Sequence, residues 1–176
     1  MVEFGMLEIR KAVEADKPQV WEIIKSVIST GDTYVFSPDS PEEKMLAYWF
    51  AADRKTYVAI WSEPPAAAGG LNQKILGTFF LKDYQPDLGS HIANAGYMVA
   101  PEAKGKRIGR AMAEFSLEEA RRLGYQAMQF NFVVKSNEVA VKLWMNLGFE
   151  IIGEIPEAFH HAENGLTNAL IMYRKL

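Results

Sequence analysis

The chain has 176 residues, of which 49% are apolar and 23% charged, and it carries a net charge of −3. This size and composition predict one globular domain over residues 1–176, and the slight acidity argues against nucleic-acid binding through a basic face. No stretch reaches the ~18 consecutive apolar residues of a membrane span, and residues 1–8 lack an export signal, so we expect a cytoplasmic protein that binds no membrane. The absence of cysteine excludes disulfides and a thiol nucleophile, and the three histidines are too few and too scattered to predict a metal site.

The first third of the chain predicts a strand followed by two helices. Residues 7–13 alternate in polarity, as a half-buried strand does. Asp16 is the predicted N-cap of the first helix, with Gln19 completing a capping box, and a second capping box begins at Ser40. The aromatic connector between the helices, residues 33–36, is either a packed loop over the core or a wall of a substrate pocket.

Three further strands are predicted before the middle of the chain. Residues 56–61 and 74–82 are rich in β-formers and read as a hairpin, with the Pro-, Ala- and Gly-rich residues 64–73 as its connection. Residues 92–100 form the third of these strands, and a proline follows directly where that strand must end.

Residues 96–110 then read as a strand, a basic turn with glycines, and the start of a helix. Gly105 and Gly109 allow a ligand to come close to the backbone, and the N–H groups and dipole of the helix N-terminus suit a phosphate or pyrophosphate. Four basic side chains oppose the dipole there unless an anion compensates them: Lys104, Lys106, Arg107 and Arg110. The alternative is an ordinary connection in an α/β protein, since neither a Walker loop nor a dinucleotide fingerprint is present.

The rest of the chain alternates strands and helices. The helix over residues 106–123 is apolar on most sides and is followed by Gly124 as the predicted C′ residue. A strand on each side of this helix implies a parallel pair joined by a right-handed crossover. The remaining elements are a strand over 126–134, a helix over 135–148, a strand over 149–154, a loop over 156–165 and a closing strand over 168–174.

Residues 99–111, Val-x-Pro-Glu-x-x-Gly-Lys-x-Ile-Gly-x-Ala, resemble the acetyl-CoA pyrophosphate loop of the GNAT superfamily of acyl-CoA N-acyltransferases. The usual pattern of that loop, Arg/Gln-x-x-Gly-x-Gly/Ala, falls on Lys104, Arg107 and Gly109. Two positions depart from it, because lysine replaces Arg/Gln and Arg107 stands in place of the middle glycine. If Arg107 keeps an ordinary helical or bridge conformation, its amide can still donate to a phosphate.

Residues 136–149, Ser-Asn-Glu-x-Ala-x-x-Leu-Trp-x-x-Leu-Gly-Phe, are similar to a second GNAT segment that passes near the coenzyme thiol. The matching positions are Asn137, Ala140, Leu143, Gly148 and Phe149. Asn137 also fits a helix N-cap, and the two roles are compatible. Trp144 stands where many members have a tyrosine that protonates the leaving thiolate, which an indole cannot do.

The resemblance implies an α/β (α+β) fold with a mixed central sheet of six to seven strands in the order β-α-α-β-β-β-α-β-α-β-β. Helices would cover both faces, and parallel strands would splay at the coenzyme site. It also implies acetyl-CoA as a co-substrate, with the pantetheine arm paired to the strand edge and the thioester carbonyl polarised by a backbone N–H of that strand. The implied coenzyme-binding residues are Met98, Val99, Lys104, Gly105, Lys106, Arg107, Ile108, Gly109, Arg110, Asn137 and Trp144.

The implied function is direct transfer of an acetyl group to the primary amine of a small molecule or amino-acid-like acceptor in a ternary complex. The polar candidates for the catalytic site are Tyr34, Asn94, Tyr97 and His160, although His160 and His161 fit a solvated loop pair better. Two alternatives stay open: acetylation of a protein or peptide, which needs an open groove, and a non-catalytic acetyl-CoA sensor. A homodimer is compatible with all three.

Overall fold

The chain folds into strands and helices in the order predicted, in a computed structural model that describes residues 6–63, 72–103 and 105–176. The strands are β1 (Met6–Lys11), β2 (Lys55–Glu63), β3 (Asn72–Asp83), β4 (Ile92–Val99), β5 (Ala127–Val134), β6 (Glu150–His161) and β7 (Gly165–Lys175). The helices are α1 (Lys17–Ile28), α2 (Glu42–Trp49), α3 (Ile108–Arg122) and α4 (Glu138–Asn146). Most of the connection predicted at 64–73, and all of Lys104, lie outside the described residues.

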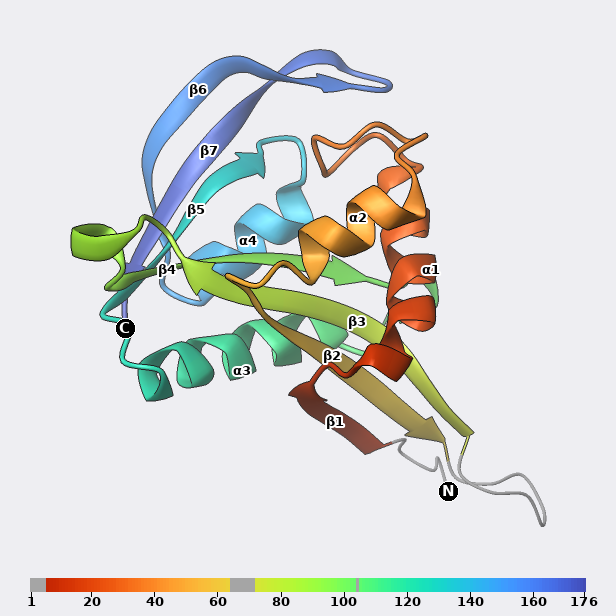
Figure 1. The fold of residues 1–176 in the computed structure, drawn as a ribbon. Helices are drawn as coiled ribbons and strands as arrows, with labels where there is room; N and C mark the ends of the chain where they lie inside the picture. The colour runs from red at the N-terminus through yellow and green to blue at the C-terminus, as the bar shows by residue number, and fades with distance from the viewer. Residues whose placement is uncertain (1–5, 64–71, 104) are drawn as a thin grey trace.

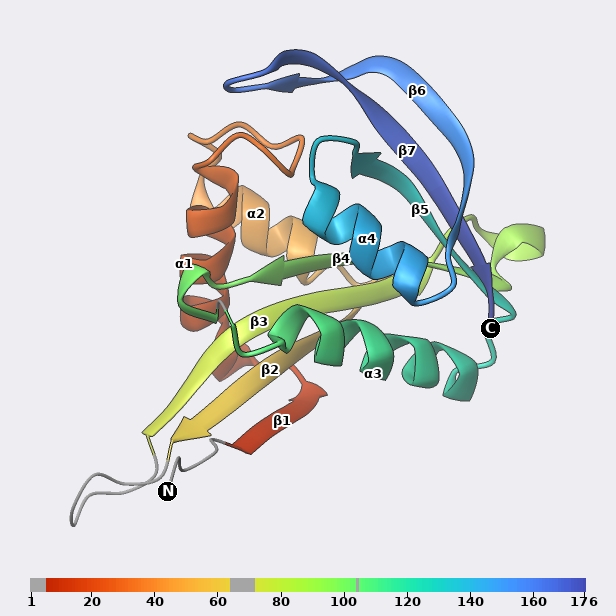
Figure 2. The ribbon, with the colours of Figure 1, turned by 180° about the vertical axis from the view of Figure 1, so that it is seen from behind.

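Within the described residues, one mixed sheet of seven strands runs in the order β1-β2-β3-β4-β5-β7-β6. Helices α1 and α2 lie on one face of the sheet and α3 and α4 on the other (Figures 1 and 2). This is the mixed fold that the sequence predicts, with helices on both faces. No helix in the described part of the chain is long and apolar enough to span a membrane.

The parallel pair at the centre of the sheet is short. Strands β4 and β5 pair only at Ile92 with Ala127 and at Ala93 with Met128, and beyond that point the two strands separate. On their outer sides both strands stay paired antiparallel, β4 with β3 and β5 with β7. The fold therefore contains the predicted splay, which opens between two strands that the rest of the sheet holds in place.

Buried aromatic and polar side chains tie the helices to the sheet. The indole of Trp49 donates to Thr78 at 2.9 Å between α2 and β3, and the ring of Tyr57 stacks on Phe79 at 4.8 Å. The Tyr57 hydroxyl donates to the carboxylate of Glu119 on α3 at 2.7 Å. Because buried polar groups without partners are costly, these bonds set which face of each helix meets the sheet.

Both predicted capping boxes are wrong. Asp16 is the N-cap residue of α1, as predicted, but its carboxylate makes no cap hydrogen bond, because it accepts from Arg10 at 2.7 and 3.0 Å and from the N–H of Val13 at 2.8 Å. The Gln19 side chain accepts from the backbone N–H of Ile75 on β3 instead of turning back on its own helix. At α2 the residue after Ser40 is the N-cap, and the Ser40 hydroxyl is buried without a partner. In each helix a tertiary contact or a shifted start prevents the local bond.

The predicted loop at 156–165 is also wrong, because β6 continues through it to His161. A register shift between Ile155 and Phe159 accommodates the proline in this stretch. Glu157 takes a positive φ of 51° there, and its N–H donates to the side chain of Asn168 on β7 at 2.9 Å. The bulge keeps the hairpin paired across a residue that cannot donate to the ladder.

Candidate active site

The open edge of β4 faces the gap between β4 and β5. The carbonyl of Ile92 accepts from the N–H of Tyr84, which places the backbone of Ile92 on the β3 side. Successive residues of a strand face opposite sides, so the N–H groups of Tyr97 and Val99 point toward β5. The ladder with β5 ends at Ala93, which leaves these groups on an edge that an extended, peptide-like ligand can pair with.

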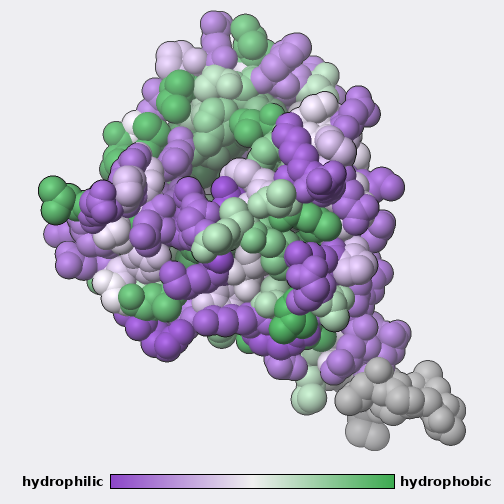
Figure 3. All heavy atoms as spheres, viewed as in Figure 1, coloured by the Kyte–Doolittle hydropathy of each residue, from purple (hydrophilic) through white to green (hydrophobic). Residues whose placement is uncertain are grey.

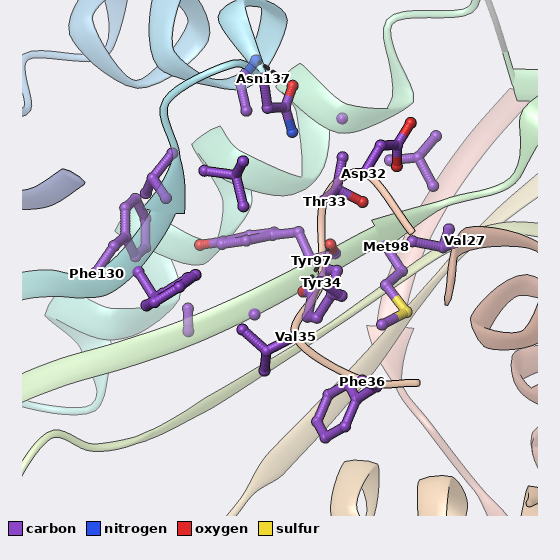
Figure 4. Close-up of a pocket in the computed structure, with 18 of the residues that line it drawn as sticks. Val27, Asp32, Thr33, Tyr34, Val35, Phe36, Tyr97, Met98, Phe130 and Asn137 are labelled. Atoms are coloured by element: carbon purple, nitrogen blue, oxygen red, sulfur yellow. Dashed lines mark hydrogen bonds between the residues drawn. The ribbon is translucent and has the colours of Figure 1, made fainter. Parts of the chain in front are cut away.

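Gly96 lets two aromatic side chains lie against this strand. A Cβ at Gly96 would stand 2.8 Å from a ring atom of Phe80 and 3.2 Å from the hydroxyl of Tyr34. That hydroxyl donates to the carbonyl of Tyr97 at 2.9 Å, so the connector between α1 and α2 is anchored on the open edge (Figure 4). Tyr34, Val35 and Phe36 all line the cavity described next, so this connector forms part of its wall.

A cavity of about 660 Å³ fills the space between the separated strands. Its volume is typical of small-molecule sites, and Figure 3 shows a hollow with largely apolar walls below the β6–β7 hairpin. The walls come from the connector, from residues 94–99 of β4, from residues 130–134 of β5 and from the first turns of α4. Among the described residues that line it, Asp32 is the one with a charged side chain.

The turn of the β6–β7 hairpin lies beside the connector between α1 and α2 (Figure 1). The N–H of Ala162 donates to the carbonyl of Gly31 at 3.1 Å. His161 is buried at 9% exposure, and its Nδ1 accepts from the N–H groups of Glu163 and Asn164. His161 therefore shapes this turn and is not part of a solvated loop pair.

The glycine turn leads into α3 at one end of the cavity. Gly105 and Arg107 both have a positive φ, 81° and 56°, and α3 begins directly after Arg107. Arg107 thus does not take the helical or bridge conformation under which its amide was expected to donate, and its left-handed backbone explains why a glycine suits this position. Gly109 lines the cavity, and a Cβ there would meet only Val99 at 3.6 Å.

Two of the basic side chains of this turn, Lys106 and Arg110, have partners within the protein. Lys106 lies 3.4 Å from the carboxylate of Glu63 and 4.6 Å from the ring centre of Trp61. Arg110 pairs with Glu114 at 2.8 Å, whereas Arg107 is exposed. The side chain of Ile108 is buried in the core at 1% exposure, so this residue can offer a ligand only its backbone. Met98 is also 1% exposed, and its backbone groups face β3 rather than the open edge.

Asn137 and Trp144 border the cavity from α4. The Asn137 side chain caps the helix by accepting from the N–H of Ala140 at 3.2 Å, as predicted. The ring of Trp144 packs 4.9 Å from that of Tyr97 and 4.6 Å from that of Phe130. Trp144 is therefore an apolar wall of the site.

The catalytic candidates differ in where they lie. Tyr34, Asn94 and Tyr97 line the cavity, and Asn94 donates to the carbonyl of Gln129 at 2.8 Å across the point where the strands separate. His160 is exposed on β6 and is absent from the described residues that line the cavity. Burial raises the pKa of both Tyr34 and Tyr97 well above the ordinary value, so both hydroxyls stay protonated near neutral pH.

Sequence reasoning missed two features of the site. Asp32 follows a helix end and looks like an ordinary turn residue, so no local signal marks it. The glycine at position 96 was a usable signal, since glycine inside a strand often marks a close approach. This signal identifies the contact only when it is known that Phe80 and Tyr34 meet at Gly96, and both residues are distant from it in sequence.

A splayed parallel pair beside a glycine turn and a helix N-terminus is the arrangement that the resemblance implied. The sequence model of the Acetyltransferase (GNAT) family matches residues 20–149. The chain therefore belongs to this family of acyl-CoA N-acyltransferases.

Two curated relatives match part of their length. The N-acetyltransferase aca1 of Schizosaccharomyces pombe is 31% identical over 137 residues, which cover 74% of this chain and 66% of that protein. Protein SPT10 of Saccharomyces cerevisiae is 29% identical over 86 residues, 49% of this chain and 13% of that protein. The chain thus spans just under two thirds of the first relative and a small part of the second.

Solved structures match over nearly the whole chain. A GCN5-related N-acetyltransferase from Kribbella flavida is 37% identical with a TM-score of 0.85, covering 97% of this chain and 98% of that one. The structure of yncA from Salmonella typhimurium, solved with its cofactor acetyl-CoA, is 21% identical with a TM-score of 0.77, covering 97% and 94%. At that identity the second likeness shows the fold alone.

Proposed function

We propose that the protein is an acetyl-CoA-dependent N-acetyltransferase that moves an acetyl group directly to the primary amine of a small acceptor. The observation that carries this proposal is the open edge of β4, which ends at a helix N-terminus on one side and at an aromatic wall on the other. With no cysteine in the chain, a covalent acetyl-cysteine step has no nucleophile, so both substrates must be bound together.

The end of the cavity at Gly109, together with the open edge of β4, suits a pyrophosphate and the amide-containing pantetheine arm of the coenzyme. The backbone around Gly105 and Gly109 gives N–H donors at the start of α3, where the helix dipole favours an anion. The edge N–H groups of Tyr97 and Val99 can pair with the amides of a pantetheine arm or polarise a thioester carbonyl. When bound, acetyl-CoA supplies the activated acetyl group.

The shape of the acceptor end favours a small molecule over a folded protein. The bond between Ala162 and Gly31 joins the hairpin turn to the connector, whose residues 32–36 line the cavity. A protein acceptor needs an open groove to deliver a lysine or an N-terminus, and this contact closes one side of it. We therefore keep the small acceptor as the proposal and protein acetylation as the competing outcome.

Few side chains that line the cavity can take part in proton transfer. Tyr34 and Tyr97 are protonated near neutral pH, so they can donate hydrogen bonds but cannot take up the proton of the attacking amine. Asp32 is the one carboxylate among the described lining residues, which makes it the candidate acceptor of that proton, directly or through water. Trp144 cannot protonate the leaving thiolate, which can depart unaided because a thiol has a pKa of about 8–9.

The first test is calorimetric titration with acetyl-CoA, free CoA and ATP, followed by an acetyl-transfer assay with a panel of amines. We expect micromolar binding of acetyl-CoA, about −8 kcal/mol, no binding of ATP, and release of free CoA only when an acceptor is present. Binding without turnover by any amine would favour the sensor. Absence of binding to either coenzyme would refute the assignment of the site.

A further inference from the structure

The end of the cavity formed by the connector and α2 carries a chain of aromatic rings. The ring of Tyr34 stacks on that of Phe36 with centres 6.2 Å apart, and Phe36 meets Tyr48 edge-on at 4.8 Å. Tyr48 in turn packs edge-on against Phe80 at 6.1 Å. All four side chains line the cavity, and we call them the ring wall. Because each ring packs on the next, the ring wall is a firm apolar surface.

Part of the ring wall remains uncovered. Tyr48 is 37% exposed, Phe36 is half-buried, and the neighbouring Val35, which also lines the cavity, is 61% exposed. Large apolar side chains are ordinarily buried, and apolar surface in contact with water is costly. A ligand that covers these side chains removes that cost, so the ring wall favours an apolar group with a flat face.

Tyr34 joins the ring wall to the open edge of β4. Its hydroxyl donates to the carbonyl of Tyr97 at 2.9 Å, and the N–H of Tyr97 points to the same gap between the strands. In the close-up, Val35 and Phe36 lie on one side of Tyr34 and Asp32 lies on the other (Figure 4). An acceptor whose amine reaches the edge at Tyr97 can therefore rest its body on the ring wall.

The charge in the cavity sets a second condition on the acceptor. Asp32 is the one charged side chain among the described residues that line the cavity, and its charge is negative. A carboxylate beside the amine would meet this like charge between largely apolar walls, where water screens the repulsion weakly. An acceptor without an acidic group avoids this repulsion.

We propose that the acceptor is a primary amine on a short chain that ends in an aromatic ring, with no acidic group beside the amine. The ring of the acceptor packs on Phe36 and Tyr48, and its amine lies at the open edge of β4. The inference rests on the proposed acetyl transfer and narrows its substrate class. Stacking between aromatic rings adds to the burial of apolar surface, so the ring wall distinguishes a ring from an alkyl chain.

The test compares 2-phenylethylamine with propylamine as acceptors, in the wild type and in Phe36→Ala. Both amines have the same reacting group, and only the first carries a ring. The measured quantity is the ratio of kcat/KM for 2-phenylethylamine to that for propylamine, and its change between proteins cancels the different amine pKa values. We expect the wild type to prefer 2-phenylethylamine, and Phe36→Ala to lower the ratio about 10- to 100-fold, mainly through KM.

Matched variants separate loss of the ring from general damage. Phe36→Tyr keeps a ring at this position and should keep the preference. Phe50→Leu removes a ring two residues from Tyr48 that is not among the described residues lining the cavity, and it should leave the ratio unchanged. Thermal melting records any loss of stability in each variant, and the affinity for acetyl-CoA should stay close to that of the wild type.

Inhibition by 2-phenylethanol gives a readout that needs no chemical step. This alcohol has the ring and the chain but no amine, so we expect it to compete with 2-phenylethylamine for the wild type. At the same concentration 1-propanol should not compete. Phe36→Ala should weaken the inhibition by 2-phenylethanol, because the alcohol then loses its contact with the ring wall.

L-Phenylalanine tests the condition on charge. It is 2-phenylethylamine with a carboxylate added beside the amine, and its amide has the same skeleton without the negative charge. With kcat/KM expressed per concentration of neutral amine, we expect L-phenylalanine to be a poorer acceptor than both 2-phenylethylamine and L-phenylalaninamide.

The outcomes separate the proposed function from the acceptor class. Absence of acetyl-CoA binding to the wild type would overturn the proposed function, and binding without turnover of any amine would overturn both in favour of the sensor. Acetyl transfer with equal kcat/KM for 2-phenylethylamine and propylamine, or an equal loss for both in Phe36→Ala, would overturn the role of the ring wall alone. A faster reaction with L-phenylalanine would overturn the condition on charge. If Phe36→Ala fails to fold, Tyr48→Leu and the inhibition of the wild type by 2-phenylethanol decide the matter.

Discussion

Replacing Gly96 by alanine adds one methyl group at the most crowded point of the site. The new Cβ would lie 2.8 and 2.9 Å from two ring atoms of Phe80 and 3.2 Å from the hydroxyl of Tyr34. The ring of Phe80 is 3% exposed and packs edge-on against Trp49, so it cannot move aside freely. The methyl group must therefore push both aromatic side chains away from β4.

The free energies can be compared term by term. Overpacking of this kind costs about 1–3 kcal/mol, and loss of the bond from Tyr34 to the Tyr97 carbonyl adds about 1 kcal/mol. Alanine recovers about 0.4–1 kcal/mol, because the unfolded chain loses freedom and Gly96 has no positive φ that would strain it. The cost of the steric clash and the lost hydrogen bond exceeds the gain from the unfolded chain. We expect a net destabilisation of about 2 kcal/mol, or a decrease in Tm of roughly 4–8 °C for a chain of this size.

Denaturant unfolding of the variant and the wild type measures this loss, with acetyl transfer measured in parallel. Gly109→Ala is the matched control, since its Cβ meets only Val99 at 3.6 Å and should not destabilise. A Gly96→Ala protein that unfolds like the wild type and transfers acetyl groups at full rate would refute the close approach at β4.

Three further predictions follow from the same contacts. Gly109→Glu should fold normally, because the position is open, but should abolish acetyl-CoA binding in calorimetry through bulk and charge; normal affinity would show that the coenzyme does not bind there. Tyr34→Phe should lower the free energy of unfolding by about 1 kcal/mol and reduce acetyl transfer, whereas unchanged values would mean that the bond to Tyr97 does not position the connector. The Glu119 carboxylate has its pKa lowered from 4.5 to about 2 by hydrogen bonds from Arg122 and then from Tyr57. The contribution of this carboxylate to the free energy of unfolding is therefore complete above pH 4.5 and is lost as the pH falls toward 2. The free energy of unfolding of Glu119→Gln, measured with urea, should thus depend less on pH over that range than that of the wild type. An equal pH dependence in the two proteins would contradict the pairing.

The elements of the fold were predictable where the signal is local. Alternation and helical spacing located the strands and helices, and the glycine turn with the segment after Asn137 indicated the family. The capping box at Ser40 failed because α2 begins one residue later, and the other failures arose because a partner outside the local segment binds a group whose role was predicted from its neighbours. Arg10 binds the carboxylate expected to cap α1, and Asn168 supports the bulge that carries β6 past its proline. Local sequence patterns do not show which residues from elsewhere in the chain will make these contacts.

The candidate site was predictable in part for the same reason. Asn137 caps α4 as expected, because that bond spans three residues. The meeting of Tyr34 with the carbonyl of Tyr97 spans 63 residues and depends on how the connector crosses the sheet. The left-handed backbone of Arg107 was not predicted either, since a long charged side chain ordinarily avoids that conformation.

By itself the sequence determined the family, the order of the elements and the position of the glycine turn before α3, because glycine spacing and apolar periodicity are properties of neighbouring residues. Only the tertiary structure decided what lies at the other end of the cavity. There β4 and β5 separate after two paired residues, and Gly96 leaves room for the side chains of Phe80 and Tyr34. These features depend on the packing of α2 and the connector against the sheet, where contacts between distant residues outweigh local preference.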